Sequence, residues 1–270
     1  MDHRPQAWGR PRDDVYGAYD GSYLNHSGPK NATQSPVVTG TSVIALKFAD
    51  GVVMAADNLA SYGSLARFTN VQRLRTFHNN TIIGFGGDVS DMQFLDRLIM
   101  EIEIHQEYEL EQLPDIKAQK PLELMHAGNL FTFLKNQMYH CRNHFQPLWN
   151  HILVAGFDDD KKPFLSSVDL RGTTFSAPSL ATGFGAALAQ PIMRKYADTE
   201  EQAAKLTREQ AVEVVKECMK VLFYRDARSL DRYSIAVVTK DGIELKQDEQ
   251  LEKQSWAFAE RIKGYGTQTV

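Results

Sequence analysis

The sequence predicts an α+β protein in which helices cover two packed antiparallel sheets. Strand-like apolar runs occur in clusters, and pairs of helical patterns separate the clusters. Strands and helices would alternate strictly in a doubly wound parallel sheet, so the clustering argues against that fold class. Two short turns, Ala49-Asp50-Gly51 and Asp241-Gly242, each join a pair of apolar runs, which is typical of antiparallel hairpins.

Apolar runs define the expected strands. The first hairpin is expected over residues 42–57, where an alternating run precedes the turn and an almost entirely apolar run follows it. A further strand, residues 80–88, ends in a run of glycines. Residues 151–170 predict two strands joined by a charged turn, and residues 233–246 predict the closing hairpin.

Capping residues mark the start of two expected helices. Asp88 follows a strand pattern and precedes residues with helical spacing, so we expect it to be an N-cap. Thr207 and Gln210 have the spacing of a capping box at the start of a helix that reaches Phe223. The helix after Asp88 carries one apolar face, formed by Met92, Leu95, Leu98, Ile99 and Ile102.

Prolines mark the other two expected helices. Pro121 favours a helix start, because a proline at the first helical position loses no hydrogen bond, and that helix is expected to run to about Arg142. A short helix near residues 186–196 is expected to be interrupted or kinked at Pro191.

Composition and charge exclude several classes of function. The chain of 270 residues has a formal net charge of −4, so it offers no basic surface of the kind that binds nucleic acid. No apolar run approaches the roughly 20 residues that span a membrane, and the first residues lack the apolar core of a signal peptide. Two cysteines, Cys141 and Cys218, are too few for a disulfide framework. We expect a soluble intracellular protein with no nucleic-acid or membrane partner and no cofactor.

The ends of the chain differ from its middle. Residues 1–40 are rich in proline, glycine, serine, asparagine and tyrosine and lack periodicity, so we expect a disordered leader before a folded domain at 41–250. Residues 251–270 continue beyond the closing hairpin with large apolar side chains, which is unusual for a chain end in solvent. These side chains are Trp256, Phe258, Ile262 and Tyr265. We expect them to bind a partner as a C-terminal arm, and the alternative is a helix folded back on its own domain.

The Gly40-Thr41 junction before the first hairpin is the candidate for chemistry. A threonine hydroxyl becomes a nucleophile only when a base takes its proton, and an N-terminal threonine uses its own α-amine for that purpose. Such a site requires cleavage after Gly40, a nearby cation, an acid that orients the cation and backbone N–H groups for the oxyanion. A Gly-Thr pair alone is a weak signal, because most such pairs are ordinary turns.

Four motifs together carry a resemblance to a known family. They are the stretch from Gly40 to Asp57, GFGGD at 84–88, ATGFGA at 181–186 and YRDARS at 224–229. The chain from Thr33 to Val270 resembles the β subunits of the proteasome core particle, and its finer matches resemble a non-catalytic member. The resemblance implies the N-terminal nucleophile hydrolase fold, a four-layer αββα sandwich of two antiparallel sheets between helix layers.

The resemblance also implies roles for the positions around Thr41. Thr41 occupies the nucleophile position, and Asp57 and Asp226 occupy the two acid positions. Ser229 matches a serine near the amine, and Gly87 matches the glycine whose N–H serves as oxyanion donor.

Four replacements around Thr41, at Arg73, Phe184, Ala186 and Leu59, together indicate that this site is inactive. Arg73 falls where the family has its catalytic lysine, and an arginine effectively cannot lose its proton. Phe184 falls where active members have a serine that helps to bind the amine, and we expect its ring to fill that space. Asp57 and Asp226 are then expected to form ion pairs with Arg73 and other positive groups. Thr41 is interpreted as the remnant of a nucleophile.

The resemblance therefore implies a non-catalytic structural β subunit. We expect it to support ring assembly in a particle of four rings and 28 subunits, to contact other α and β subunits, and to reach the opposite β ring with its C-terminal arm. The particle would degrade ubiquitin-marked proteins with ATP in cytoplasm and nucleus. Trimming is expected between Ala32 and Thr33. The alternative is an active N-terminal threonine hydrolase that uses Thr41.

His140 and His144 lie four residues apart near an expected helix end, which is the spacing of a metal-binding pair. No further ligand type clusters near them in the sequence, so a solvated helix end is the preferred interpretation and no metal is expected.

Overall fold

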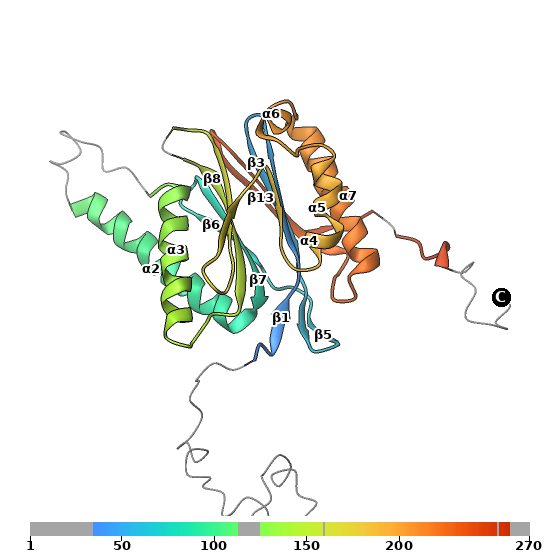
Figure 1. Ribbon diagram of the computed structural model, residues 1–270, viewed down its shortest axis with the longest axis horizontal. Helices are drawn as coiled ribbons and strands as arrows, with labels where there is room; N and C mark the ends of the chain where they lie inside the picture. The colour runs from blue at the N-terminus through green and yellow to red at the C-terminus, as the bar shows by residue number, and fades with distance from the viewer. Residues whose placement is uncertain (1–34, 113–124, 159, 253, 260–270) are drawn as a thin grey trace, which may run out of the picture. The chain divides into compact units, whose positions relative to one another are not determined.

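The computed structural model describes residues 35–112, 125–158, 160–252 and 254–259. The described chain forms two antiparallel sheets with helices on both outer sides (Figure 1). The predicted four-layer sandwich is thereby confirmed. Every helix in the described part of the chain is too short or too polar to span a membrane.

The larger sheet has eight strands, in the order β10-β9-β8-β7-β1-β4-β5 with β6 paired to β7. Their bounds are β1 Val38–Gly40, β4 Ala60–Tyr62, β5 Leu65–Phe68, β6 Leu74–Phe77, β7 Thr81–Asp88, β8 Asn150–Phe157, β9 Pro163–Val168 and β10 Thr174–Ser176. β6 pairs with the first half of β7, and β1 pairs with its last two residues. One edge of β7 is therefore shared by two different segments.

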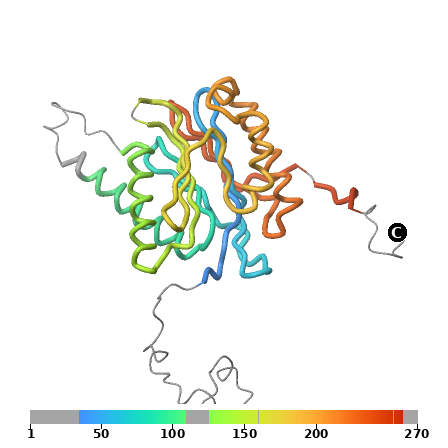
Figure 2. Tube along the Cα trace, in the orientation of Figure 1, coloured from blue at the N-terminus to red at the C-terminus, as the bar shows by residue number. Residues whose placement is uncertain are grey.

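The smaller sheet has five strands in the order β11-β2-β3-β12-β13. Their bounds are β2 Val43–Phe48, β3 Gly51–Asp57, β11 Ser179–Ala181, β12 Arg232–Thr239 and β13 Gly242–Gln250. The two hairpins predicted from apolar runs, β2–β3 and β12–β13, are confirmed. Figure 2 shows how the blue and red ends of the described chain meet in this sheet, where β3 pairs with β12.

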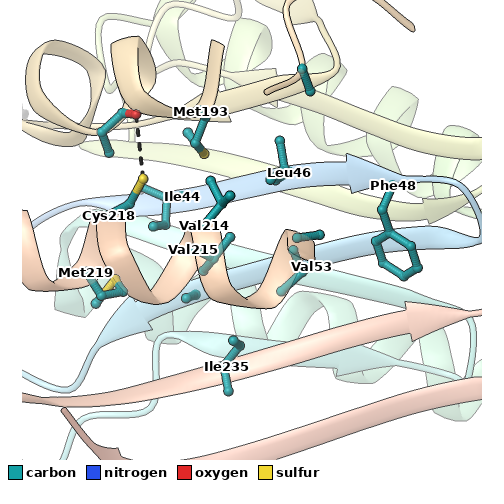
Figure 3. Packing of buried hydrophobic residues seen from close by; sticks show 14 of the residues in the cluster. Ile44, Leu46, Phe48, Val53, Met193, Val214, Val215, Cys218, Met219 and Ile235 are labelled. Carbon is teal, nitrogen blue, oxygen red and sulfur yellow. Dashed lines mark hydrogen bonds between the residues drawn. The ribbon is translucent and has the colours of Figure 1, made fainter. Parts of the chain in front are cut away.

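β2 and β3 are buried on both faces because they lie between two apolar layers. Successive side chains of a strand point to opposite faces. Ile44 and Leu46 therefore face the helix layer that includes Val214 and Cys218 (Figure 3), whereas Val43 belongs to the core between the sheets. This explains why the run lacks the strict polar alternation of a half-exposed strand.

Helices α2 (Val89–Gln112) and α3 (Ala127–Asn143) cover the larger sheet (Figure 1). Asp88 is the N-cap of α2 as predicted, since its Oδ2 accepts the N–H groups of Ser90 and Asp91. The start expected at Pro121 is wrong for α3, which begins at Ala127. His126 occupies the N-cap position, and its side chain makes no capping hydrogen bond, so the usual start signal is absent from the sequence.

The smaller sheet is covered by four helices: α4 (Gly185–Leu188), α5 (Gln190–Arg194), α6 (Glu200–Ala203) and α7 (Arg208–Arg225). The predicted capping box of Thr207 and Gln210 starts α7. The predicted interruption near Pro191 is present as the break between α4 and α5 at Ala189. A second capping box, Thr199 with Gln202, starts α6, which the sequence analysis missed although the signal was there.

The predicted leader ended at residue 40, but its last residues belong to the sheet. Val38–Gly40 form β1, and the N–H of Val37 donates to Asp88 Oδ1 over 3.1 Å. Strand pairing on both sides holds this short segment, so three residues suffice without an apolar pattern of their own. The predicted trimming site at Ala32 and Thr33 lies outside the described residues.

Candidate functional site

Thr41 lies where the chain passes from β1 in the larger sheet to β2 in the smaller one. Its hydroxyl donates to Oδ2 of Asp226 over 2.7 Å. Asp226 ends α7 and is buried, and its Oδ1 accepts the N–H of Arg228. The expected ion pair of Asp226 is wrong, because no cationic group among the described residues pairs with it. The threonine hydroxyl and a backbone N–H take its oxygens instead.

Arg73 is 1% exposed and donates five hydrogen bonds. Nε donates to the backbone oxygen of Asp57 over 2.9 Å, and Nη2 donates to the carboxylate Oδ1 of the same residue. Nη1 donates to the carbonyl oxygens of Thr41 and Phe85 over 2.9 and 3.2 Å. Nη2 also donates to the carbonyl oxygen of Ser42 over 3.0 Å. A guanidinium has five N–H donors, so all of them are used.

The strand order explains why Arg73 reaches this position. It directly precedes β6, and its carbonyl oxygen accepts the N–H of Phe85 over 3.0 Å. Its side chain therefore enters between the first residue of β6, Leu74, and the last residue of β1, Gly40, along the same edge of β7. A Cβ at Gly40 would lie 2.5 Å from Arg73 Cδ, so only a glycine leaves room for this side chain.

Asp57 ends β3 and is buried with Arg73 as an ion pair, as predicted. Burial raises the pKa of the Asp57 carboxyl above its ordinary value, and the Arg73 charge and the N–H of Leu59 oppose that rise. The pair therefore compensates two charges that would be costly to bury singly.

Gly87 lies beside the segment that precedes Thr41. It is opposite Gly40 in the pairing of β1 with β7, and its φ of 94° favours glycine. A Cβ there would also lie 2.1 Å from the carbonyl oxygen of Trp149. The expected oxyanion position is thus next to the chain's own β1 strand.

A pocket of about 360 Å³ opens beside Thr41. Its lining includes Gly87, Trp149, His151, Thr182 and Phe184. Phe184 lines the same pocket as Thr41, directly before α4, and is 61% exposed. The expectation that its ring fills the space next to Thr41 stays a prediction. Burial lowers the pKa of His151, partly opposed by Asp169.

Ser229 does not face Thr41. Its hydroxyl lies 3.0 Å from the carbonyl oxygen of Leu222 and 2.8 Å from that of Asp226. Both carbonyls lie at the C-terminal end of α7, and that of Leu222 also accepts the N–H of Asp226. Ser229 therefore stabilises the helix end that positions Asp226.

Two hydroxyls that the sequence analysis missed hold the pocket's far wall. Ser42 Oγ accepts the N–H of Gly185, and Thr182 Oγ1 accepts the N–H of Val43, both over 2.9 Å. They join the loop before α4 to the start of β2. Thr182 lies in the ATGFGA motif, so its position was the available signal.

Among the described residues, Asp226 is the side chain that contacts the Thr41 hydroxyl. In the uncleaved chain the nitrogen of Thr41 belongs to the peptide bond with Gly40, and the Arg73 guanidinium has every N–H engaged. An arginine retains its proton at any pH that a folded protein tolerates. The geometry therefore orders the backbone around Thr41 without activating its hydroxyl.

A family model described as "Proteasome subunit" matches residues 37–238 of this chain. The chain belongs to the proteasome subunit family. Within the proteasome family, it is 45% identical to "Proteasome subunit beta type-7" of Saccharomyces cerevisiae, over 100% of both chains. It is 46% identical to "Probable proteasome subunit beta type-7" of Schizosaccharomyces pombe, over 98% of this chain and 97% of the other.

A relative from outside the fungi is also similar. "Proteasome subunit beta type-4" of Xenopus laevis is 41% identical over 88% of this chain and 93% of its own. The finer motif matches had predicted similarity to the seventh β subunit in fungal naming, called beta type-4 in mammals. That resemblance is confirmed.

The described part of the C-terminal tail contacts its own domain. Trp256 and Phe258 stack on each other, with ring centroids 5.7 Å apart, and both meet the ring of Tyr224 at the end of α7. The Tyr224 hydroxyl accepts the N–H of Ser255 and donates to its carbonyl oxygen, both over 3.0 Å. Trp256 and Phe258 nevertheless remain 52% and 46% exposed. The other two predicted partner-binding residues, Ile262 and Tyr265, lie outside the described residues.

The predicted solvated helix end at His140 and His144 fits the structure. His144 Nδ1 lies 2.8 Å from the carbonyl oxygen of His140, and both side chains are exposed at the end of α3. No third metal-ligand type joins them among the described residues.

Proposed function

We propose that this chain is a non-catalytic structural β subunit of the proteasome core particle. The observation that carries the proposal is the engagement of all five Arg73 donors, three of them by backbone carbonyls at or next to Thr41 and Asp57. A cation held in this way serves the fold. The same observation disfavours the alternative of a threonine hydrolase, because an arginine keeps its proton and cannot take one from the Thr41 hydroxyl.

The remaining site residues have structural roles in this proposal. Asp57 balances the Arg73 charge, Asp226 orients the Thr41 hydroxyl, and Ser229 stabilises the end of α7. Gly87 lets the end of β7 lie close to the backbone of Trp149, directly before β8. The pocket at Phe184 remains open but has no activated nucleophile.

The proposed partners are the other α and β subunits of a four-ring particle in cytoplasm and nucleus. The C-terminal segment is proposed to leave the domain at the Tyr224 cluster and to reach the opposite β ring. The half-exposed rings of Trp256 and Phe258 support this proposal, because aromatic side chains of this kind often anchor interfaces. The described contacts also show that these two rings first pack on their own domain.

The proposal is tested by a pair of substitutions at Thr41, made in the full chain and measured in purified particles. Thr41→Val removes the hydroxyl and keeps the shape, whereas Thr41→Ser keeps a hydroxyl that can react. A structural subunit predicts the same peptidase activity per particle for both variants and the wild type, within about twofold. A loss of tenfold or more of one peptidase activity in Thr41→Val, with activity kept in Thr41→Ser, would support the hydrolase instead.

A further inference from the structure

A cluster of metal-ligand side chains lies apart from Thr41, between the turn after β6 and the helix α2. His78 follows β6 in that turn, and Glu103 and Glu107 lie one helical turn apart on α2. One ligand atom from each of the three lies within 4.8 Å of the other two. We propose that these residues bind a divalent transition-metal ion of the zinc class.

The hydrogen bonds of His78 determine which ring nitrogen is free. Nε2 lies 2.9 Å from Oε1 of Gln106, and the same oxygen accepts the N–H of Met125 over 3.5 Å. Since Oε1 accepts, Nε2 donates, and the neutral ring carries its lone pair on Nδ1. The side chain is 3% exposed. A metal-binding histidine is usually fixed in this way by a hydrogen bond from its other nitrogen.

Nδ1 points at a second acceptor. It lies 3.9 Å from Oε1 of Glu103, which is too long for a hydrogen bond. The same oxygen accepts the backbone N–H of His78 over 2.7 Å, and this hydrogen bond holds the Glu103 carboxylate beside the ring. A cation between Nδ1 and Oε1 would bind a lone pair of each. Two ligands of one zinc ion, each about 2.0–2.2 Å from it, are roughly 3.3 Å apart, so a small closure would form the site.

The charges around the cluster leave a deficit of positive charge. Oε2 of Glu103 pairs with Arg75 over 3.0 Å, and Arg75 also pairs with Asp96 over 3.1 Å. Asp96 and Glu103 therefore share one guanidinium, and Glu107 adds a third carboxylate beside His78 and Glu103. A divalent cation would balance the remaining two negative charges, and Arg75 would hold the Glu103 ligand from behind.

The ligand types select the metal. One imidazole nitrogen with two carboxylates suits zinc, whereas calcium and magnesium prefer oxygen ligands alone. Glu107 is exposed, so the ion can enter from solvent and water can complete its coordination. The bound ion would cross-link the β6–β7 turn to the C-terminal half of α2.

The backbone offers a conservative test variant. His78 has a φ of 46°, a conformation that asparagine tolerates, so His78→Asn removes the ligand with little backbone strain. Glu107→Gln removes one charge at an exposed position, and Glu101→Gln is its control on the same helix, outside the cluster.

The experiment uses particles that contain the full chain, equilibrated with zinc and desalted. Zinc content should fall by one equivalent per copy of this chain in His78→Asn and stay unchanged in Glu101→Gln. Glu107→Gln should raise the zinc concentration at half occupancy roughly tenfold or more. Anomalous diffraction at the zinc edge should place the ion on His78 Nδ1. Unchanged zinc content in His78→Asn, or no anomalous peak at Nδ1 in zinc-saturated wild-type crystals, overturns the proposal and leaves His78 as an ordinary ion-pair partner of Glu103.

Discussion

Arg73 Nη1 donates to the carbonyl oxygen of Thr41 over 2.9 Å, so the cation beside the threonine binds its backbone and not its hydroxyl. The hydroxyl donates to Asp226 over 2.7 Å. An aspartate carboxylate is a much weaker base than an amine, so this contact orients the hydroxyl without activating it. The same atoms that a catalytic threonine would use are thus occupied by structural contacts.

Thr41 is expected to resist covalent labelling even after the lysine is restored. Arg73→Lys supplies an amine that can titrate, but Thr41 remains in a peptide bond with Gly40. Catalytic groups act as a unit, so restoring one of them alone restores little of the catalytic activity. Mass spectrometry after treatment with a threonine-directed inhibitor should find no adduct on Thr41 in wild type or Arg73→Lys. Reactive subunits of the same particle serve as the positive control. An adduct on Thr41 in Arg73→Lys would show that the arginine is the only obstacle.

Arg73 is expected to contribute strongly to stability. Arg73→Met leaves the Asp57 charge buried without its partner and removes donors from several carbonyls, so we expect a loss of about 3–5 kcal/mol in the free energy of unfolding. The exposed Arg97 provides the control, and Arg97→Met should change that free energy by less than about 0.5 kcal/mol. Denaturant titration of the purified chain measures both. Equal stability of the two variants would refute the structural role of Arg73.

We expect the segment before Thr41 to remain in the mature chain, because β1 in that segment links the β4–β5 hairpin to β7. The mature chain should begin upstream of Thr41, at Thr33. N-terminal sequencing that returns Thr-Ser-Val-Ile would contradict this prediction.

Two truncated chains test the reason for that retention. A chain that starts at Thr33 should fold like the full chain, whereas one that starts at Thr41 lacks both pairings of β1. Hydrogen exchange in Ala60–Phe68 should then become faster only in the shorter chain. Equal exchange in both would mean that β1 is dispensable for the larger sheet.

The C-terminal segment is expected to depend on Tyr224. Tyr224→Phe removes both hydrogen bonds to Ser255 and keeps the ring contacts with Trp256, so backbone exchange at 255–259 should become faster. Tyr196→Phe, at another exposed tyrosine, is the control.

Deletion of Gly264 to Val270 tests the proposed arm itself. The domain should stay folded, because these residues follow the closing hairpin, but joining of two half-particles should become slower. Native gels should show accumulated half-particles. Full particles at normal rate and yield would assign the tail to its own domain.

His151 is expected to make the chain less stable in mild acid. Burial lowers its pKa in the folded state below the ordinary value of 6.5, so below that value the unfolded chain binds more protons. The free energy of unfolding therefore keeps its full value, as far as His151 is concerned, above pH 6.5. It decreases as the pH drops from 6.5 toward the lowered pKa. Thermal unfolding between pH 7.5 and about 5 should show a shallower decline in His151→Gln, and an unchanged decline in the exposed control His140→Gln. An identical decline in wild type and His151→Gln would contradict the lowered pKa.

Much of the fold could be predicted because its signals are local. The turn at Asp241-Gly242, the cap at Asp88 and the capping box at Thr207 each depend on residues a few positions apart, and all are present. Strands β4, β5, β10 and β11 were missed because they are short, and their pairing partners rather than their own patterns define them. The start of α3 was wrong since His126 carries no capping signal.

The sequence alone also indicated that the site carries a permanent positive charge. Position 73 is an arginine, and an arginine differs from a lysine in any environment. Its five acceptors could not be named in advance, because they come from β3, the β1–β2 junction and β7, which meet only when strand pairing and the packing of the two sheets bring them together. The sequence placed Ser229 near the threonine, but its hydroxyl bonds to carbonyl oxygens at the end of α7. Residue types set which charges must be compensated, whereas the register of distant strands sets which atoms compensate them.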